Sequence, residues 1–168
     1  MKELYLNPHQ LQIEEIPADG NCLYRAIAKQ LEFLNSTTAT DSGGTSYDYE
    51  TMRSLCADQL MKLREEYEPF ADLDYSNVSS YDEYVEKVRA SSEWEGHLEL
   101  RALSSALDKT IVVYSADGAP LHHIRNGDEN GDTNDDGGNG GTIRLSFHRR
   151  YYALGEHYNS VVPIATTE

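Results

Sequence analysis

The spacing of apolar residues changes along the chain, from helical in the first two thirds to alternating in the last third. Residues 11–16 alternate imperfectly and predict a short strand or an extended entry segment. Pro17 and Gly20 break this pattern, and from Cys22 to Leu34 the apolar residues lie on one face of a helix. Cys22 therefore stands where a polar turn passes into a predicted helix.

The second predicted helix follows a polar stretch at residues 35–48, which we expect to be a loop. Its apolar stripe spans residues 52–67 and includes Cys56. Pro69 is expected to end this helix, because proline has no N–H to donate and clashes with the preceding turn.

A third helix is predicted behind Ser80, because Glu83 three residues later completes a capping-box pattern. Apolar residues over 81–88 then recur at helical spacing. Leucines at helical spacing over residues 100–107 predict a fourth helix, which starts near Gly96.

After residue 109 the pattern becomes typical of strands. Residues 110–114 form a β-branched run, and 121–125 are expected to pair with them through a turn. Residues 143–147 alternate clearly, and two more strands are predicted at 151–154 and 158–164. Helices first and an antiparallel-looking strand set last predict an α+β fold in a single domain over residues 1–168.

Residues 126–141, NGDENGDTNDDGGNGG, are acidic and of low complexity, so we expect a flexible loop there. Its aspartates are oxygen donors of the kind that Ca²⁺ takes. The order of an EF-hand loop is not met, however, because no Glu closes it. The sequence therefore predicts no metal site.

Composition restricts the function classes. Hydrophobic residues make up 39% and charged residues 26% of the 168 residues, as in an ordinary globular domain. A formal net charge of -15 argues against a nucleic-acid ligand and suits a basic partner, or serves solubility alone. No apolar run is long enough for a membrane helix, and the N-terminus has no signal-peptide core. Two cysteines fit a reducing compartment, so we expect a cytoplasmic protein, with the nucleus as a second location.

The position of Cys22 favours a nucleophile. A helix N-terminus lowers the pKa of a thiol because its free N–H groups and dipole favour negative charge. The backbone N–H groups of Gly20, Asn21 and Cys22 are candidates to bind a developing oxyanion. The structural alternative is a small buried residue at a helix start.

A cysteine nucleophile also needs a base, and His157 is the best candidate of the six histidines. It precedes an apolar strand, and Asn159 lies on the same face two positions later. The Asn159 amide oxygen could accept from one imidazole nitrogen and leave the other for Cys22. Asp19 is a second candidate to orient His157, or else it caps the helix that begins near Cys22.

Three segments resemble the OTU (ovarian tumour) family of cysteine proteases, which are deubiquitinases. DGNCLYRAI at 19–27 resembles the nucleophile motif, WEGHLELRAL at 94–103 a central segment, and HYNSV at 157–161 the closing histidine motif. They occur in the family's order. Glu95 departs from the pattern, since glycine is common there, and the acidic loop is a peripheral insertion.

The resemblance implies a papain-like arrangement, with a small central sheet flanked by helices. It implies that Cys22 is the nucleophile, that His157 is the general base, and that Asp19 and Asn159 position or support them. The implied substrate is ubiquitin or a polyubiquitin chain, joined through its C-terminal Gly-Gly to a lysine of a ubiquitinated protein. No metal or organic cofactor is implied.

Other functions use the same residues. A catalytically silent ubiquitin-binding module would keep the fold and lose part of the triad, whereas all four residues are present here. A cysteine acyltransferase, a protease with another peptide substrate, or one acting on a ubiquitin-like modifier would use the same thiol–imidazole pair. Only the resemblance selects ubiquitin.

Overall fold

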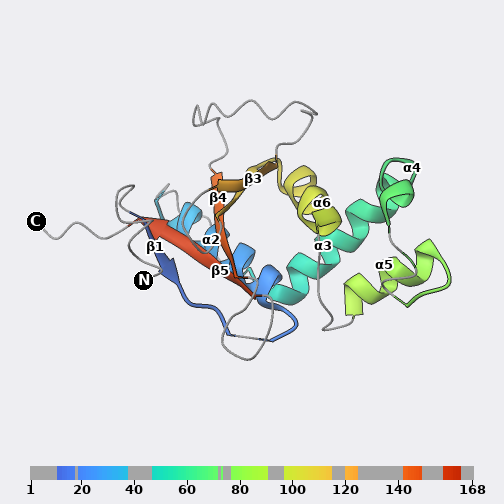
Figure 1. The fold of residues 1–168 in the computed structure, drawn as a ribbon, viewed down its shortest axis with the longest axis horizontal. Helices are drawn as coiled ribbons and strands as arrows, with labels where there is room; N and C mark the ends of the chain where they lie inside the picture. Colours follow the sequence, from blue (N-terminus) through green and yellow to red (C-terminus); the bar gives the residue numbers. More distant parts are fainter. Residues whose placement is uncertain are drawn as a thin grey trace, which may run out of the picture.

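The computed structural model describes residues 11–17, 19–37, 47–71, 73, 77–90, 97–114, 120–124, 142–148 and 157–163. Within these ranges, helices gather around one side of a five-stranded sheet (Figure 1), which confirms the α+β prediction. The helices are α2 (Cys22–Thr37), α3 (Tyr49–Lys62), α4 (Arg64–Tyr67), the 3₁₀ turn η2 (Glu68–Phe70), α5 (Tyr81–Ala90) and α6 (His97–Leu107). The strands are β1 (Leu11–Glu14), β2 (Thr110–Tyr114), β3 (Pro120–Ile124), β4 (Thr142–His148) and β5 (His157–Pro163).

The strands form one mixed sheet in the order β1-β5-β4-β2-β3. β3 pairs antiparallel with β2 as predicted, and β5 runs antiparallel to both β1 and β4. β2 and β4 are parallel, so the expectation of an antiparallel strand set is wrong at this pair. The chain reverses into β3 at the sheet edge and reverses again to reach β4. Alternation shows which face of a strand is buried but not which way the strand runs.

The main core lies between the sheet and the helices. α2 packs on β4 and β5, α3 packs on α2, and α6 packs on both α3 and β2. β2 is buried on both faces: Ile111 and Val113 belong to the main core, whereas Val112 and Tyr114 form a second cluster with Val161. Cys56 is fully buried in α3, as the apolar stripe predicted.

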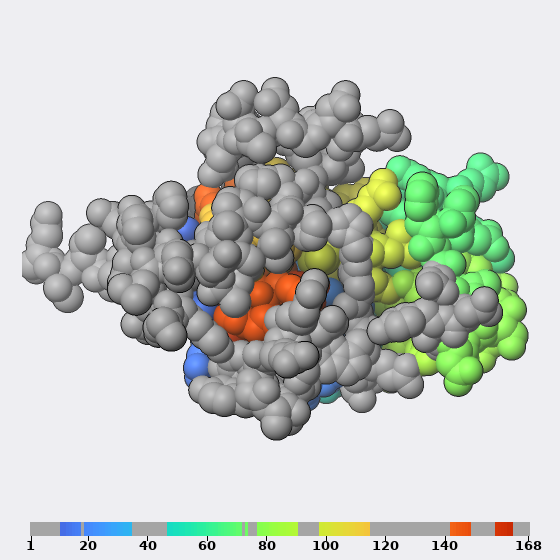
Figure 2. Space-filling view, viewed as in Figure 1, coloured from blue at the N-terminus to red at the C-terminus, as the bar shows by residue number. Residues whose placement is uncertain are grey.

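α4 and α5 stand at the end of the molecule away from the sheet (Figures 1 and 2). The Tyr81 hydroxyl of α5 donates to the Leu60 carbonyl of α3 at 2.7 Å, and burial raises the pKa of Tyr81 to about 12. The Tyr84 hydroxyl donates to the buried carboxylate of Glu99 in α6. These polar bonds join α5 to the helices beside the core.

The second predicted helix is interrupted before the residue expected to end it. α3 stops at Lys62, Leu63 adopts a non-helical conformation, and α4 follows. Pro69 lies inside η2 near its N-terminus, where its missing N–H costs nothing because a helix start leaves that group without an intrahelical partner. The prediction of one continuous helix is therefore wrong at Leu63, whereas the α-helical part does end at Tyr67, two residues before Pro69.

Other helix limits follow the prediction closely. The Ser80 hydroxyl accepts the Glu83 N–H at 3.2 Å, while the Glu83 carboxylate accepts from the backbone N–H of Ser79 instead of Ser80. α2 extends three residues into the predicted loop, to Thr37. The acidic stretch 126–141 and the predicted strand at 151–154 lie outside the described residues. Among the helices that are described, none has the length and apolar character needed to cross a membrane.

Candidate active site

Cys22 is the first residue of α2, and its side chain is 5% exposed. The loop before it forms a tight turn, in which the Asp19 N–H donates to the Pro17 carbonyl at 3.0 Å and the Cys22 N–H to the Asp19 carbonyl at 3.2 Å. The Asn21 carbonyl then accepts the first helical bond from the Arg25 N–H at 2.8 Å. The predicted change from turn to helix therefore occurs at the cysteine itself.

Asp19 lies at the surface and holds one side of this loop. Its carboxylate accepts the Asn21 N–H at 2.9 Å and binds the Arg25 guanidinium, with Nη2 at 3.0 Å and Nε at 3.0 Å. Arg25 also lies over the Tyr49 ring of α3, 4.4 Å from its centroid. The sequence leaves two roles open for Asp19, as an orienter of His157 or as a cap of the helix near Cys22. These contacts hold the turn directly before that helix and so lie nearer to the capping role.

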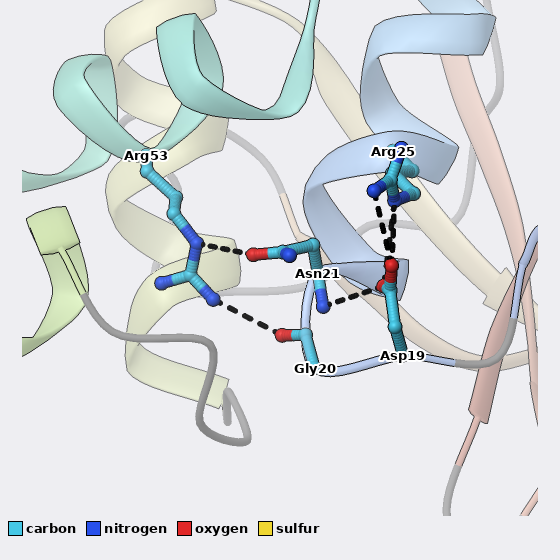
Figure 3. A network of polar contacts seen from close by, with 5 residues as sticks. All are labelled: Asp19, Gly20, Asn21, Arg25 and Arg53. Carbon is cyan, nitrogen blue, oxygen red and sulfur yellow. Dashed lines mark hydrogen bonds and ion pairs between the residues drawn. The ribbon is translucent and has the colours of Figure 1, made fainter.

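Arg53 of α3 holds the other side of the loop (Figure 3). Its side chain is buried, with 3% exposed. Nε donates to Asn21 Oδ1 at 2.7 Å and Nη2 donates to the Gly20 carbonyl at 3.0 Å. Nη1 donates to the Val88 carbonyl of α5 at 2.7 Å, and the guanidinium lies 4.4 Å from the centroid of the Tyr24 ring.

His157 and Asn159 begin β5 and lie on one face of the strand, as their spacing predicted. Both are buried, at 2% and 1% exposed. His157 Nε2 and Asn159 Oδ1 are 2.9 Å apart. Because the amide oxygen can only accept, Nε2 carries a proton, and Nδ1 is the nitrogen through which the imidazole would exchange a proton with a thiol.

The same Asn159 oxygen accepts a second hydrogen bond, from the backbone N–H of Ile16 at 2.8 Å. Ile16 lies three residues before Asp19, in the segment that leads from β1 into the cysteine loop. One amide group thus orients the imidazole and fixes the entry to the loop.

Gln30 fixes the position of α2 against the sheet. Its buried amide donates to the Ser160 hydroxyl at 2.6 Å and to the Val161 carbonyl at 2.8 Å on β5. Its oxygen accepts the Arg144 N–H of β4 at 2.8 Å. Since Cys22 and Gln30 belong to one helix, these bonds fix the helix that starts at Cys22 relative to the strand that starts at His157.

A second buried histidine lies beside the first. His148 is directly opposite His157 in the β4–β5 pairing, and Ser146 is opposite Asn159. The Ser146 hydroxyl and His148 Nε2 are 3.0 Å apart. The sequence showed that His148 ends a strand, but not that the strand pairing brings the two imidazoles to one face.

The arrangement suits acyl transfer. It contains a thiol at a helix start and an imidazole with an assigned tautomer on a strand that packs against that helix. The predicted oxyanion donors are Gly20, Asn21 and Cys22. In this structure the N–H groups of Asn21 and Cys22 are engaged within the loop, with Asp19 as their acceptor. Over the described part of the chain, no group of three or more potential metal ligands occurs.

Sequence reasoning missed Arg53 and Gln30. Both carry a recognisable signal, since each lies at helical spacing from apolar core residues of its own helix. Arg53 precedes Cys56, Ala57 and Leu60 by three, four and seven residues. A long polar side chain on a buried face is uncommon unless it has a specific partner.

Proteins of similar sequence match most of the length of this chain. Deubiquitinase OTUD6B of Xenopus laevis is 34% identical over 166 residues, which cover 96% of this chain and 50% of that protein. Ubiquitin thioesterase otu2 of Schizosaccharomyces pombe is 26% identical over 155 residues, which cover 88% and 44%. The chain spans about half the length of these curated relatives.

Solved structures share the fold. The OTU domain of OTUD1 superposes with a TM-score of 0.65 at 20% identity, covering 96% of this chain and 92% of that chain. The Hazara virus OTU bound to ubiquitin gives 0.56 at 20% identity, covering 95% and 85%. The pattern of the OTU-like cysteine protease family matches residues 17–158, from the turn before Cys22 to the strand that carries His157. The chain therefore belongs to the family of OTU-like cysteine proteases.

Proposed function

We propose that this chain is a deubiquitinating cysteine protease that hydrolyses the isopeptide bond after the C-terminal glycine of ubiquitin. Membership of the family and the names of the relatives support this activity. The observation that carries the proposal is the hydrogen bond between His157 Nε2 and Asn159 Oδ1, because it orients the imidazole as the base of a cysteine protease requires. A catalytically silent ubiquitin-binding module would not need an imidazole in a fixed orientation.

The proposed reaction has two stages. With His157 holding Cys22 as thiolate, the sulfur attacks the carbonyl of ubiquitin's last glycine, and His157 then protonates the leaving lysine amine. Water hydrolyses the thioester with His157 as base, which regenerates the thiol. Asn159 accepts from the Nε2–H at every stage, so that Nδ1 is the nitrogen that gains and loses the proton.

The family selects ubiquitin as the substrate, and the charge of the protein is compatible with that choice. The arginines of the ubiquitin tail suit a protein of formal net charge -15. Several exposed carboxylates lie on α4 and α5, including Glu65, Glu66, Asp82 and Glu86. We propose ubiquitin, polyubiquitin chains and ubiquitinated proteins as the partners.

Cleavage of a panel of di-ubiquitins, with a set of ubiquitin-like conjugates in parallel, tests this function. We expect the wild-type protein to release mono-ubiquitin and Cys22→Ala to release none while still binding ubiquitin. Cleavage of a ubiquitin-like conjugate alone would assign a different modifier. Ubiquitin binding by a folded wild-type protein without turnover of any conjugate would favour the silent module.

We also propose that the protein works in a reducing compartment, the cytoplasm or the nucleus. Its two cysteines, Cys22 and Cys56, form no disulfide, and both are buried. A fluorescent fusion of the full-length protein tests this location, and accumulation in the secretory pathway would contradict it.

A further inference from the structure

We propose that Arg53 is a positioning residue for acyl transfer at Cys22, because it fixes the peptide between Gly20 and Asn21 in one orientation. The inference rests on the proposed function, since an oxyanion forms only if Cys22 attacks a carbonyl. Arg53 lies on α3 and not on the loop, so its part in the site comes from its hydrogen bonds to the loop.

The two ends of one peptide unit are held from opposite sides (Figure 3). The Gly20 carbonyl accepts from Arg53 Nη2 at 3.0 Å, and the Asn21 N–H of the same peptide donates to Asp19 at 2.9 Å. Rotation of this peptide plane would break both bonds. Gly20 lacks a Cβ and would otherwise allow that rotation easily.

The guanidinium geometry suits this task. Three different nitrogens of Arg53 donate to three acceptors: the Asn21 side chain, the Gly20 carbonyl and the Val88 carbonyl. The Tyr24 ring at 4.4 Å restricts the plane of the group further. A lysine has the same charge but a single nitrogen, so it cannot span acceptors on two separate segments.

Arg53 differs from a simple link between helices. Arg89 of α5 binds Asp58 of α3 at 2.9 Å and so joins the same two helices, but it has no contact with the cysteine loop among its ion pairs and hydrogen bonds in the described residues. Arg53 instead donates two hydrogen bonds to the loop, to Asn21 and to Gly20. Arg89 is therefore the matched control for removing an arginine between α3 and α5.

Two reactions of Cys22 distinguish a positioning role of Arg53 from a general loss of thiol reactivity. Acyl transfer needs loop N–H groups directed at a developing oxyanion, and such donors work only when they are already in place. The Asn21 and Cys22 N–H groups donate to Asp19 here, so the Gly20 N–H is the candidate donor whose direction Arg53 would fix, by holding the Gly20 carbonyl. Alkylation of the same thiol by iodoacetamide forms no oxyanion. Loss of Arg53 should therefore slow acyl transfer and leave alkylation of Cys22 unchanged, whereas general unfolding would alter both.

The experiment compares wild type, Arg53→Met, Arg53→Lys and Arg89→Met on ubiquitin that carries a fluorogenic amide at its C-terminal glycine. For both Arg53 variants we expect kcat to fall about 100-fold with KM within about threefold, the size seen when one oxyanion donor is lost. Alkylation of Cys22 should stay within about twofold of wild type. Arg89→Met should match wild type in all three measurements.

Three results would overturn the inference. One is a kcat near wild type in a folded Arg53→Met protein, and another is a parallel fall in alkylation. The third is full activity in Arg53→Lys, which would assign the effect to charge instead of geometry. If the Arg53 variants do not fold, Asn21→Ala decides, because it removes one Arg53 acceptor from the loop and leaves α3 and α5 intact. We expect a fall in kcat of about tenfold, and an unchanged kcat would reject the inference.

Hydrolysis of p-nitrophenyl acetate keeps this inference separate from the choice of substrate. The ester acylates a thiol through the same kind of oxyanion without any need for ubiquitin. A wild-type protein that hydrolyses the ester but not the ubiquitin amide would contradict the proposed function. The Arg53 variants would still decide the present inference through their ester rates.

Discussion

The two halves of the site are held in different ways. The Cys22 half depends on guanidinium groups: Arg25 at the surface and Arg53 in the interior fix a short loop from both sides. The His157 half depends on the Asn159 amide oxygen, which accepts from the imidazole and from the Ile16 N–H between β1 and the cysteine loop. Strand pairing positions the base once β5 forms, whereas the loop needs side chains from other elements. Substitutions in the Cys22 half and in the His157 half should therefore change the rate and the stability to different extents.

Removing either reacting group should have the largest effect on kcat. The loss should be similar whether the group removed is the thiol of one half or the imidazole of the other. We expect Cys22→Ala and His157→Ala each to lower kcat by at least about 10⁴-fold, with little further loss in the double variant. Steady-state hydrolysis of ubiquitin amide measures this. Cys56→Ala is the matched control for a cysteine removed from the same core, and turnover by Cys22→Ala above a buffer blank would contradict the assignment.

Truncating Asn159 should affect rate and stability together. Asn159→Ala leaves the His157 and Ile16 N–H groups buried without their acceptor, which should lower the free energy of unfolding by about 2–4 kcal/mol. We expect kcat to fall by about 100-fold as the imidazole loses its fixed tautomer. Urea unfolding and steady-state kinetics measure the two effects. Asn159→Asp keeps an acceptor and should retain more of both, and equal losses in the two variants would argue against this role.

Breaking the Asp19–Arg25 pair should affect rate without much change in stability. The pair is partly exposed, so its loss should change the free energy of unfolding by less than about 1 kcal/mol. Arg25→Met removes the ion pair and the contact with the Tyr49 ring but keeps the Asp19 bond to the Asn21 N–H, and we expect a fall in kcat of about threefold. Asp19→Ala also frees the Asn21 N–H and should cost about tenfold. A larger fall in kcat for Arg25→Met than for Asp19→Ala would contradict this, because the bond from the Asn21 N–H to Asp19 would then not be the contact that supports the rate.

Cys56→Ala should give the smallest change in activity. Cys56 is fully buried in α3, and its thiol lies 3.8 Å from the Glu99 carbonyl. We expect a loss of about 1 kcal/mol in unfolding free energy and an unchanged rate per folded molecule. Thermal unfolding and active-site titration with iodoacetamide measure this. A fall in turnover with intact circular dichroism would show that the second cysteine contributes to the site.

The sequence predicted those parts of the site that depend on local spacing. His157 and Asn159 are two residues apart in a strand, so their shared face followed from strand geometry. The position of Cys22 at a helix start followed from the change in pattern after Gly20. Both inferences need only neighbouring residues.

Contacts between distant segments could not be predicted in the same way. Arg53 reaches a loop 32 residues away, and Gln30 reaches a strand 130 residues away. The sequence indicates that both are polar residues on buried helix faces. It does not indicate which groups they bind. The parallel pairing of β2 and β4 was missed for a similar reason, because it depends on the path of the chain between them.

Gln30 also changes the hydrogen-bond ladder between β4 and β5. The register ends with Leu145 opposite Ser160, and at the next position the Gln30 amide lies between the Arg144 N–H and the Val161 carbonyl. A helix side chain thus takes the place of one interstrand bond. Deuterium exchange at the Arg144 amide therefore requires the Gln30 side chain to release it, whereas amides further along β4 exchange when the strands themselves separate. This single amide reports how often the Gln30 bridge opens between the helix that carries the nucleophile and the strand that carries the base.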